Sequence, residues 1–490
     1  MEVLWRVDGP AGRKKYGPNY TSVHELANIH LQNAGQRDAD HFHEGFGFLS
    51  QHAKMSFVFE KGLQAVDKAL TLPYWDQTIE NAQLWRGELD DEYHTDIFSP
   101  RMFGTINHSW VDLDASDWRE PMYAKFAIQD GRWAFERVGT VADAPPGSPA
   151  NAYGLLRTPW NQNPSPYVTR FATNRRFPNC MMVFAVVKPP PQQAPALRTA
   201  AWWIRNVEFL PHGPAHAGIG GGMKWNTQAT ETALRRSGLA KRVGELAAQP
   251  SVARTFAQIQ PFASHRALWR HHFIDFPDAC AGPATSCVAS VAPGVTDEAL
   301  GREIVRAQLS ADMKNAVASR VDELATPRGF GKVGRAFRDH MVGFLSGDHA
   351  SLALDPSFWP IHPAVERVYM FRLLHGGFSN ESWTATDDAP CSKGGPMRAH
   401  PGDAADACYR PDRKNASAPP DEWVGDGCCY GHRERDGWYE AFPHKTGGIE
   451  NQEMLGLLDV RTRGPFVDRG APVYHHLRWD HCEWFRRWKN

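Results

Sequence analysis

Two histidines four positions apart, His212 and His216, stand in a stretch rich in small residues. On a helix this spacing places both imidazoles on one face, one turn apart. Two neutral imidazoles so arranged can bind a borderline metal such as zinc or copper. Glu208 lies one turn earlier, where its carboxylate could orient a water or a histidine beside the metal. A chain with 22 histidines contains such pairs by chance, so the interpretation depends on further ligands.

Three other predicted helices each carry a histidine on an apolar face. The segment Ser22–Glu25 has the pattern of a capping box, and His30 continues the apolar stripe of the helix that it opens. His52 and His362 each begin the inward stripe of another helix. The alternative for each is a buried histidine that is hydrogen-bonded in the core. His43 lies apart from these, in a glycine-containing loop before His52.

Helices that all turn imidazoles inward are how helical bundles build metal sites in their cores. Imidazoles without a carboxylate or thiolate favour copper over magnesium, calcium or an iron–sulfur cluster. The candidate metal ligands are His30, His43, His52, His212, His216 and His362.

The hydrophobic patterns of the segments that carry these candidate ligands predict a mainly α fold. We expect a four-helix-bundle core, an inserted helical subdomain, long irregular loops and a few short strands. The short runs that give these loops and strands are Tyr123–Ile128, Trp133–Val138 and Met181–Val187. The predicted core comprises residues 1–224 and 346–385. The segment 225–345 is predicted to be the helical insertion, and 386–490 is a C-terminal region rich in Cys, Gly and Pro.

Composition excludes several classes of protein. The formal net charge of −1 and pI of about 7.1 show none of the excess basic charge that is typical of nucleic-acid-binding proteins. No run approaches the roughly 18 apolar residues of a membrane span. Eight cysteines without a Cys-x2-Cys pair argue against a thiolate zinc site. The late cysteines and four Asn-x-Ser/Thr sequons are compatible with secretion or another oxidising compartment.

The motifs together resemble those of type 3 copper proteins of the tyrosinase, catechol oxidase and polyphenol oxidase family. In that family the first copper is held by a helix histidine, a loop histidine and a third histidine nine positions on, in Phe-Leu-x-x-His. The loop His43 and the segment Phe48–His52 have this spacing, and Ala27–His30 resembles the start of the site. The second copper uses His-x3-His and Asp-Pro-x-Phe-x-x-x-His, which His212–His216 and Asp355–His362 match.

This resemblance implies two copper ions that oxidise ortho-diphenols, and in some members monophenols, to ortho-quinones while O2 is reduced to water. The implied partners are a small phenolic substrate and O2, with the oligomeric state left open. Phe358 matches an aromatic residue that overhangs the copper, and Glu208 a carboxylate proposed to orient a water. Gly213 stands where good monophenolases often have Asn, which favours diphenol over monophenol oxidation.

Other functions share parts of this pattern. An ortho-aminophenol oxidase would have the same ligands, a haemocyanin-like protein would bind O2 without turnover, and a zinc hydrolase would use another metal. The chain also departs from the family. His41 replaces a cysteine that is cross-linked in many eukaryotic members, Ile361 replaces the first histidine of a His-His pair, and the interval from His216 to His362 is unusually long.

Overall fold

The computed structural model describes most of the first 382 residues and four short parts of the C-terminal region. The described residues are 1–37, 40–43, 45–91, 93–106, 126–145, 147–170, 177–187, 199–220, 228–246, 261–282, 287–312, 327–340, 351–382, 431–432, 434–437, 449–461 and 479–482.

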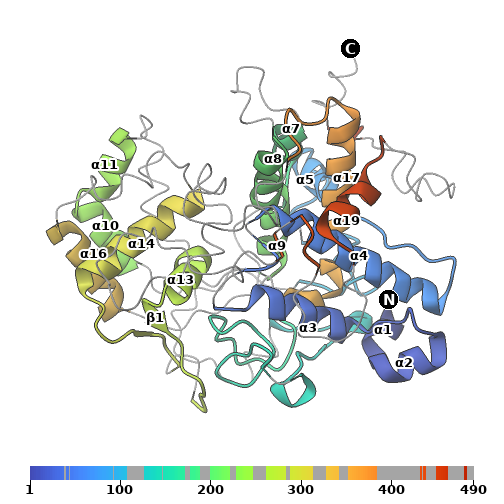
Figure 1. The fold of residues 1–490 in the computed structure, drawn as a ribbon, viewed down its shortest axis with the longest axis horizontal. Coiled ribbons are helices and arrows are strands. Elements are labelled where there is room, and N and C mark those ends of the chain that lie inside the picture. Colours follow the sequence, from blue (N-terminus) through green and yellow to red (C-terminus); the bar gives the residue numbers. More distant parts are fainter. Residues whose placement is uncertain are drawn as a thin grey trace.

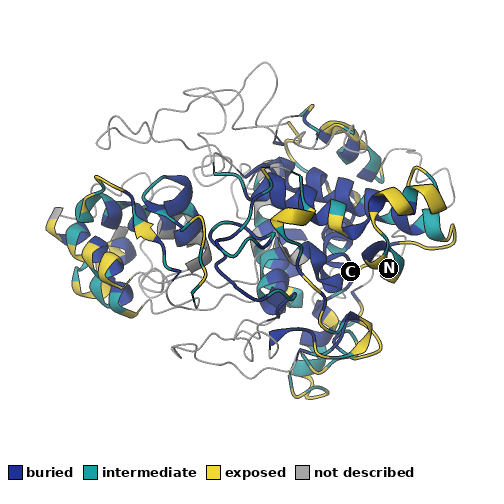
Figure 2. Ribbon diagram, turned by 90° about the horizontal axis from the view of Figure 1, so that it is seen from below, coloured by how far each residue is buried: buried dark blue, intermediate teal, exposed yellow. Residues whose placement is uncertain are grey.

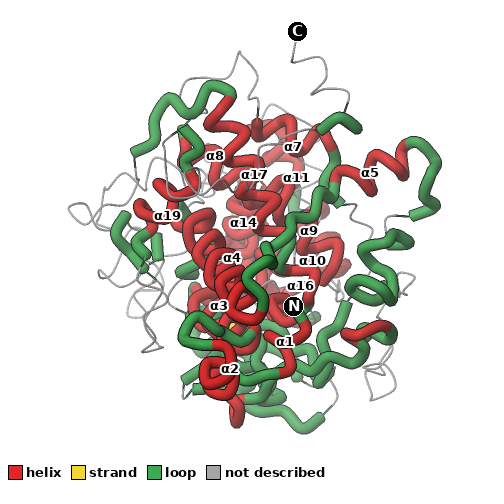
Figure 3. Tube along the Cα trace, turned by 90° about the vertical axis from the view of Figure 1, so that its right-hand side faces the viewer, coloured by secondary structure: helices red, strands yellow, loops and turns green. Residues whose placement is uncertain are grey.

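The structure is mainly helical, as predicted (Figure 3). Its first part contains α1 (Glu2–Arg6), α2 (Gly9–Tyr16), α3 (Val23–Ala34), α4 (Gly47–Val66), α5 (Thr78–Trp85), η1 (Gly131–Trp133), η2 (Val141–Asp143), α7 (Cys180–Val187), α8 (Ala200–Val207), η4 (Glu208–His212) and α9 (Gly213–Gly220). There follow α10 (Gln228–Arg236), α11 (Leu239–Leu246), α13 (Pro261–Arg270), β1 (Ile274–Asp275), β2 (Ser290–Val291), α14 (Asp297–Asp312), α16 (Pro327–Asp339), η7 (Ser351–Leu354), η8 (Pro356–Phe358), α17 (Ile361–Leu374) and α19 (Asn451–Leu458). The two strands pair antiparallel, with Ile274 opposite Val291.

Helix α3 begins where the capping box predicts. The Ser22 side chain accepts a hydrogen bond from the Glu25 backbone N–H, and the Glu25 carboxylate accepts one from the Ser22 backbone N–H. This exchange satisfies two donors that a helix start otherwise leaves without partners. Helix α3 packs against α4, and residues 26 to 34 of α3 are all buried.

Helix α4 is the central element of the core. It contacts α3, α17 and α19, and most of its residues are buried. Figure 2 shows that buried residues form much of the helical interior. The ring of Phe59 stacks on Trp359, with 4.0 Å between the ring centroids, which ties α4 to the segment just before α17. The two helices that carry His52 and His362 are therefore held together by apolar packing next to these histidines.

The prediction that Met181–Val187 is a strand is wrong, because this run lies in helix α7. A short continuous apolar run fits a buried helix as well as a buried strand, so periodicity cannot separate the two. The Asn179 side chain accepts a hydrogen bond from the Met182 backbone N–H, a typical helix-start contact that sequence spacing alone does not show. Between residues 126 and 170 the described backbone forms isolated bridges, such as Ala127 with Thr169.

The helices between α9 and η7 have an apolar cluster of their own. Figure 1 shows α10, α11, α13, α14 and α16 to one side of α3, α4, α9 and α17. Leu234, Leu268, Ile304 and Phe337 are among the buried members of this cluster. Residues 313–326 of the predicted insertion lie outside the described residues.

Parts of the C-terminal region return to the core. Helix α19 packs against α4, and a disulfide joins Cys180 of α7 to Cys482. A second disulfide joins Cys280 to Cys287. The other four cysteines, at 391, 408, 428 and 429, lie outside the described residues. Among the helices described, none is long and apolar enough to cross a membrane.

Glu366 of α17 is a buried acid next to α4, and this predicts a pH-dependent stability. Burial raises the pKa of Glu366 to about 8 from an ordinary 4.5; the Ser56 hydroxyl opposes this shift and Glu60 adds to it. Between these two pH values the folded protein holds a proton that the unfolded chain has lost, so stability falls as pH rises through the window. We expect Glu366→Gln to remove this fall, a difference of about 3–5 kcal/mol at pH 9 relative to pH 5.

Urea unfolding of copper-free protein at the two pH values measures this difference. Glu245→Gln, at an exposed position of α11 where Glu245 pairs with Lys241 at the surface, is the matched control and should keep the wild-type pH dependence. An unfolding free energy that changes equally with pH in wild type and Glu366→Gln would contradict the assignment.

Candidate metal centre

All six candidate histidines meet in the core, and none is more than 8% exposed. His30 comes from α3, His52 from α4 and His362 from α17, while His43 lies in the loop before α4. His212 ends η4 and His216 lies in α9. Segments separated by more than 300 residues in the sequence therefore contribute to one cluster of imidazoles.

The first triad consists of His30, His43 and His52. One ring nitrogen from each lies within 4.8 Å of the others. The Nε2 atoms of His30 and His52 are 3.3 Å apart, and the ring centroid of His43 is 5.1 Å from that of His30 and 4.9 Å from that of His52.

The second triad consists of His212, His216 and His362. The Nε2 atom of His212 lies 2.8 Å from Nε2 of His216 and 3.2 Å from Nε2 of His362. The two triads adjoin, because the rings of His52 and His362 stack with 4.4 Å between their centroids. A ring nitrogen of His52 also lies within 4.8 Å of those of His212 and His362.

The hydrogen bonds of these rings fit a metal that is bound through Nε2. Nδ1 of His52 lies 2.8 Å from the Phe48 carbonyl, and Nδ1 of His212 lies 3.2 Å from the Glu208 carbonyl. A carbonyl only accepts, so each Nδ1 carries the proton and each Nε2 keeps its lone pair. Lone pairs that converge in a buried space attract a cation, and neutral imidazoles suit copper.

The electrostatics of the cluster also keep the rings neutral. Burial holds the pKa of His52 well below its usual range, and the neighbouring rings of His362, His43, His30 and His212 lower it further. Both effects disfavour the protonated ring because a buried charge lacks water and repels like charges. A neutral ring is the form that binds a metal.

The second triad is shaped by a π-helical turn between α8 and α9. Pro211 lies inside this turn and has no N–H for the regular helix ladder. The Gly213 backbone N–H donates instead to the Glu208 carbonyl, five residues earlier. The same carbonyl accepts from Nδ1 of His212. The turn therefore fixes the orientation of His212 through the backbone of Glu208, whose side chain is also buried.

Phe358 lies against both triads. Its ring centroid is 5.3 Å from that of His30, 5.5 Å from that of His216 and 4.4 Å from that of His362. With an exposed fraction of 2%, its ring forms an apolar wall of the cluster.

A buried ion pair anchors the segment that carries Phe358. The guanidinium of Arg170 donates two hydrogen bonds to Asp355, at 2.7 and 2.8 Å, and both side chains are at most 1% exposed. Asp355 also accepts from the Ser357 backbone N–H and so caps η8. This pair fixes the start of the segment that leads through Phe358 to His362.

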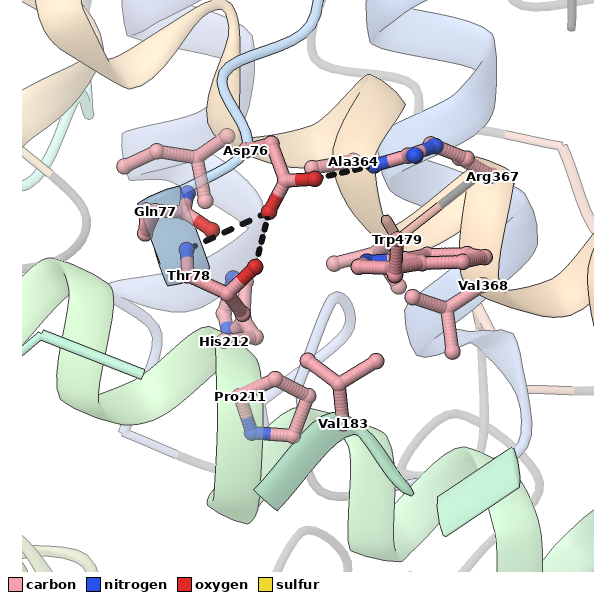
Figure 4. Close-up of a pocket in the computed structure, with 12 residues that line it drawn as sticks. Asp76, Gln77, Thr78, Val183, Pro211, His212, Ala364, Arg367, Val368 and Trp479 are labelled. Carbon is pink, nitrogen blue, oxygen red and sulfur yellow. Dashed lines mark hydrogen bonds and ion pairs between the residues drawn. The ribbon is translucent and has the colours of Figure 1, made fainter. Parts of the chain in front are cut away.

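A small cavity lies behind His212 (Figure 4). Its volume of about 20 Å³ is far below the roughly 300–1,000 Å³ of typical ligand pockets. Asp76 forms an ion pair with Arg367 on one side, and Trp479 of the C-terminal region stacks on the Arg367 guanidinium at 3.9 Å. Trp479 of the C-terminal region thus covers part of this side of the cluster.

A larger hollow of about 890 Å³ lies between α1, α2 and α3 and residues 134 to 156. None of the six histidines lines it. Asn28 of α3 faces this hollow, whereas His30, two positions further along the same helix, faces the metal centre. We therefore do not assign this hollow to the site.

The sequence did not single out Asp40, a buried acid beside the first triad. One of its carboxylate oxygens lies 3.1 Å from Nδ1 of His43. Burial alone would raise the pKa of Asp40, but His43, Arg270 and Arg266 outweigh this effect and hold the pKa well below its usual range. The spacing Asp40-x-x-His43 was a local signal for this contact, whereas the arginines come from the distant helix α13.

Comparison with known proteins agrees with this geometry. Residues 20–232 match the family model described as the common central domain of tyrosinase. The match includes five of the six histidines, and the fold adds His362 from outside it. No curated protein gives a significant match to the chain. The chain thus contains a tyrosinase central domain, which implies a dicopper site, and together with the two adjoining histidine triads this domain supports a type 3 copper protein of the tyrosinase family.

Proposed function

We propose that the protein oxidises ortho-diphenols to ortho-quinones with O2 as the electron acceptor. In this proposal, His30, His43 and His52 hold the first copper, and His212, His216 and His362 hold the second. The observation that carries the proposal is the convergence of six buried imidazoles in two adjoining triads, within a chain that has a tyrosinase central domain.

The copper pair, when bound, would supply the redox chemistry, in which two diphenols give two quinones and O2 gives two waters. The chain's own residues bind and orient. Backbone carbonyls hold two of the rings by Nδ1, so that their Nε2 atoms stay in place without reorganisation. The ring of Phe358 would pack against the phenol and exclude water, and the carboxylate of Glu208 would orient a water that accepts the phenol proton.

Oxygen uptake by the copper-loaded protein with 4-tert-butylcatechol tests the proposal. We expect uptake that depends on copper and is absent in zinc-loaded protein. The same assay with 2-aminophenol separates an ortho-aminophenol oxidase. Binding of O2 without consumption of either substrate, before and after limited proteolysis of the C-terminal region, would instead support an oxygen carrier.

Gly213 is proposed to limit activity on monophenols. A Cβ added there would lie 3.2 Å from the Glu208 carbonyl, so a side chain fits only if the backbone gives by a few tenths of an ångström. We expect Gly213→Asn to raise the ratio of monophenol hydroxylation to diphenol oxidation about fivefold. The reason is that its amide would hold the water oriented by Glu208 with one more hydrogen bond, worth about 1 kcal/mol.

Initial rates on a matched phenol and catechol pair measure this ratio. Gly213→Ala adds the same Cβ without the amide and is the matched control, for which we expect no rise. An equal rise in both variants would show that space at this position, rather than a hydrogen bond to water, controls the ratio.

A further inference from the structure

We propose that Asp40 is a positioning residue for the first copper and that the arginines of α13 hold it in place. The inference rests on the proposed function, in which His43 is a copper ligand. It makes α13, which precedes α14 and α16 in the predicted insertion, part of the copper site.

His43 has a special need for an outside support. The other five candidate ligands lie on helical turns, whose backbone hydrogen bonds fix the direction of each side chain. His43 lies in the loop before α4, where no helix ladder orients it. Its imidazole needs another partner if Nε2 is to stay directed at a metal.

Asp40 supplies this support through several contacts. Its Oδ1 accepts from the backbone N–H of Phe42 at 3.1 Å and of His43 at 2.8 Å. The same oxygen lies 3.1 Å from Nδ1 of His43. The carboxylate therefore fixes both the backbone and the ring of His43, and an Nδ1–H that donates to it leaves the Nε2 lone pair for the metal.

The second oxygen of Asp40 faces α13. Arg270 donates to Oδ2 at 3.1 Å, and Arg266 lies 3.6 Å from the same atom. Asp40 is 1% exposed and Arg270 is 3% exposed, so this pair is screened little by solvent. The guanidinium of Arg270 also donates to the Ala34 carbonyl at the end of α3, at 2.7 Å. Arg270 thus joins α13 to the loop and to the helix that carries His30.

A second set of contacts links the end of α3 to α13, this time through an arginine next to α3. Arg37, which follows α3, donates to the Trp269 carbonyl and forms an ion pair with Asp275 at 2.7 Å. The two arginines together tie the end of α3 to the end of α13 and to β1. These ion pairs join the predicted core to the predicted insertion. A change in α13 can therefore alter the geometry of the first triad.

The opposite side of the loop is held by the C-terminal region. Nε2 of His432 donates to the Asp40 carbonyl at 2.7 Å, and its Nδ1 accepts from the Gly47 backbone N–H at 3.2 Å. The side chain of Asp40 and its backbone are therefore held by different parts of the chain. The loop that carries His43 is therefore bonded to α13 on one side and to His432 on the other, and both contacts are made by Asp40.

The test uses full-length, copper-loaded protein and two variants, Asp40→Ala and Arg270→Met. We expect the first copper to leave 10- to 100-fold faster than in wild type under a chelator, with the second copper retained. The oxidised protein with one copper per chain should then show a paramagnetic Cu(II) signal, because the remaining ion has lost its coupled partner. Asp40→Asn keeps an oxygen that can accept from His43, so it should recover part of the wild-type retention.

Asp297→Asn is the matched control, since Asp297 also pairs with two arginines, Arg335 and Arg338, at a distance from the histidines. It should release copper as wild type does. Wild-type release rates in Asp40→Ala and Arg270→Met would overturn the inference, as would equal loss of both coppers together with a lower melting temperature of the copper-free protein. If Asp40→Ala fails to fold, the rate of copper release from Arg270→Met decides whether the inference holds. A wild-type chain that binds no copper would overturn the proposed function as well.

Discussion

Replacement of His216 by alanine is expected to lower the copper content from two ions per chain to about one and to bring catechol oxidation to the assay background. His216 is 1% exposed, and its Nε2 lies 2.8 Å from Nε2 of His212. In the proposed site its loss leaves the second copper with two histidines and opens a cavity next to Phe358. Oxidation of a diphenol by O2 requires both metals, so the remaining ion cannot sustain turnover.

Metal analysis, oxygen uptake and the far-ultraviolet circular dichroism spectrum measure the outcome together. His375→Ala is the matched control, because His375 is an exposed residue just after α17 whose Nδ1 donates to the Phe371 carbonyl. It should keep two coppers and wild-type activity. A His216→Ala protein that retains two coppers and full activity would contradict the ligand assignment.

The local patterns of the sequence predicted much of the fold around the site. The capping box at Ser22 begins α3 as expected, and the apolar stripe below His52 is the buried face of α4. These features depend on residues within one or two turns of each other, which is why spacing alone reveals them. The structure brings together all six histidines that the sequence selected, including the loop residue His43.

Features that depend on distant residues were not predicted. No sequence pattern indicates that Asp40 contacts Arg270, or that Arg170 contacts Asp355, because partners about 200 residues apart leave no periodicity. The π-helical turn at Glu208 was expected as ordinary helix, since Pro211 in the interior shifts the hydrogen bonds without changing the spacing of the histidines. The failure at Met181–Val187 has a different cause, namely an apolar run without a period.

These distant contacts share one role. Each joins a segment that carries a histidine to a part of the chain outside the local helix: Arg270 to the loop of His43, and Arg170 to the segment before His362. Local sequence patterns therefore identify the candidate ligands, whereas long-range ion pairs hold in place the segments that carry them. Variants in these pairs should affect the stability of the copper-free protein and the geometry of the site together.

Breaking the buried ion pair between Arg170 and Asp355 is expected to lower the stability of the protein strongly. We expect Arg170→Met to lower the unfolding free energy of the copper-free protein by about 3–5 kcal/mol, because it leaves a buried carboxylate without its partner. The Gly104 carbonyl also loses a hydrogen bond from the Arg170 guanidinium. Since Asp355 caps η8 next to Phe358, diphenol oxidation by the copper-loaded variant should fall as well.

Urea unfolding of the copper-free protein measures the change, and an exposed arginine gives the matched control. Arg461 makes two hydrogen bonds to Glu381 at the surface, so Arg461→Met should cost less than about 1 kcal/mol. The double variant Arg170→Met with Asp355→Asn removes the unpaired charge but keeps an oxygen that can cap η8, and it should recover part of the loss. A loss of unfolding free energy in Arg170→Met that is no larger than the loss in Arg461→Met would show that the buried ion pair does not hold this segment. Apolar packing around Trp359 would then hold residues 355–362 in place instead.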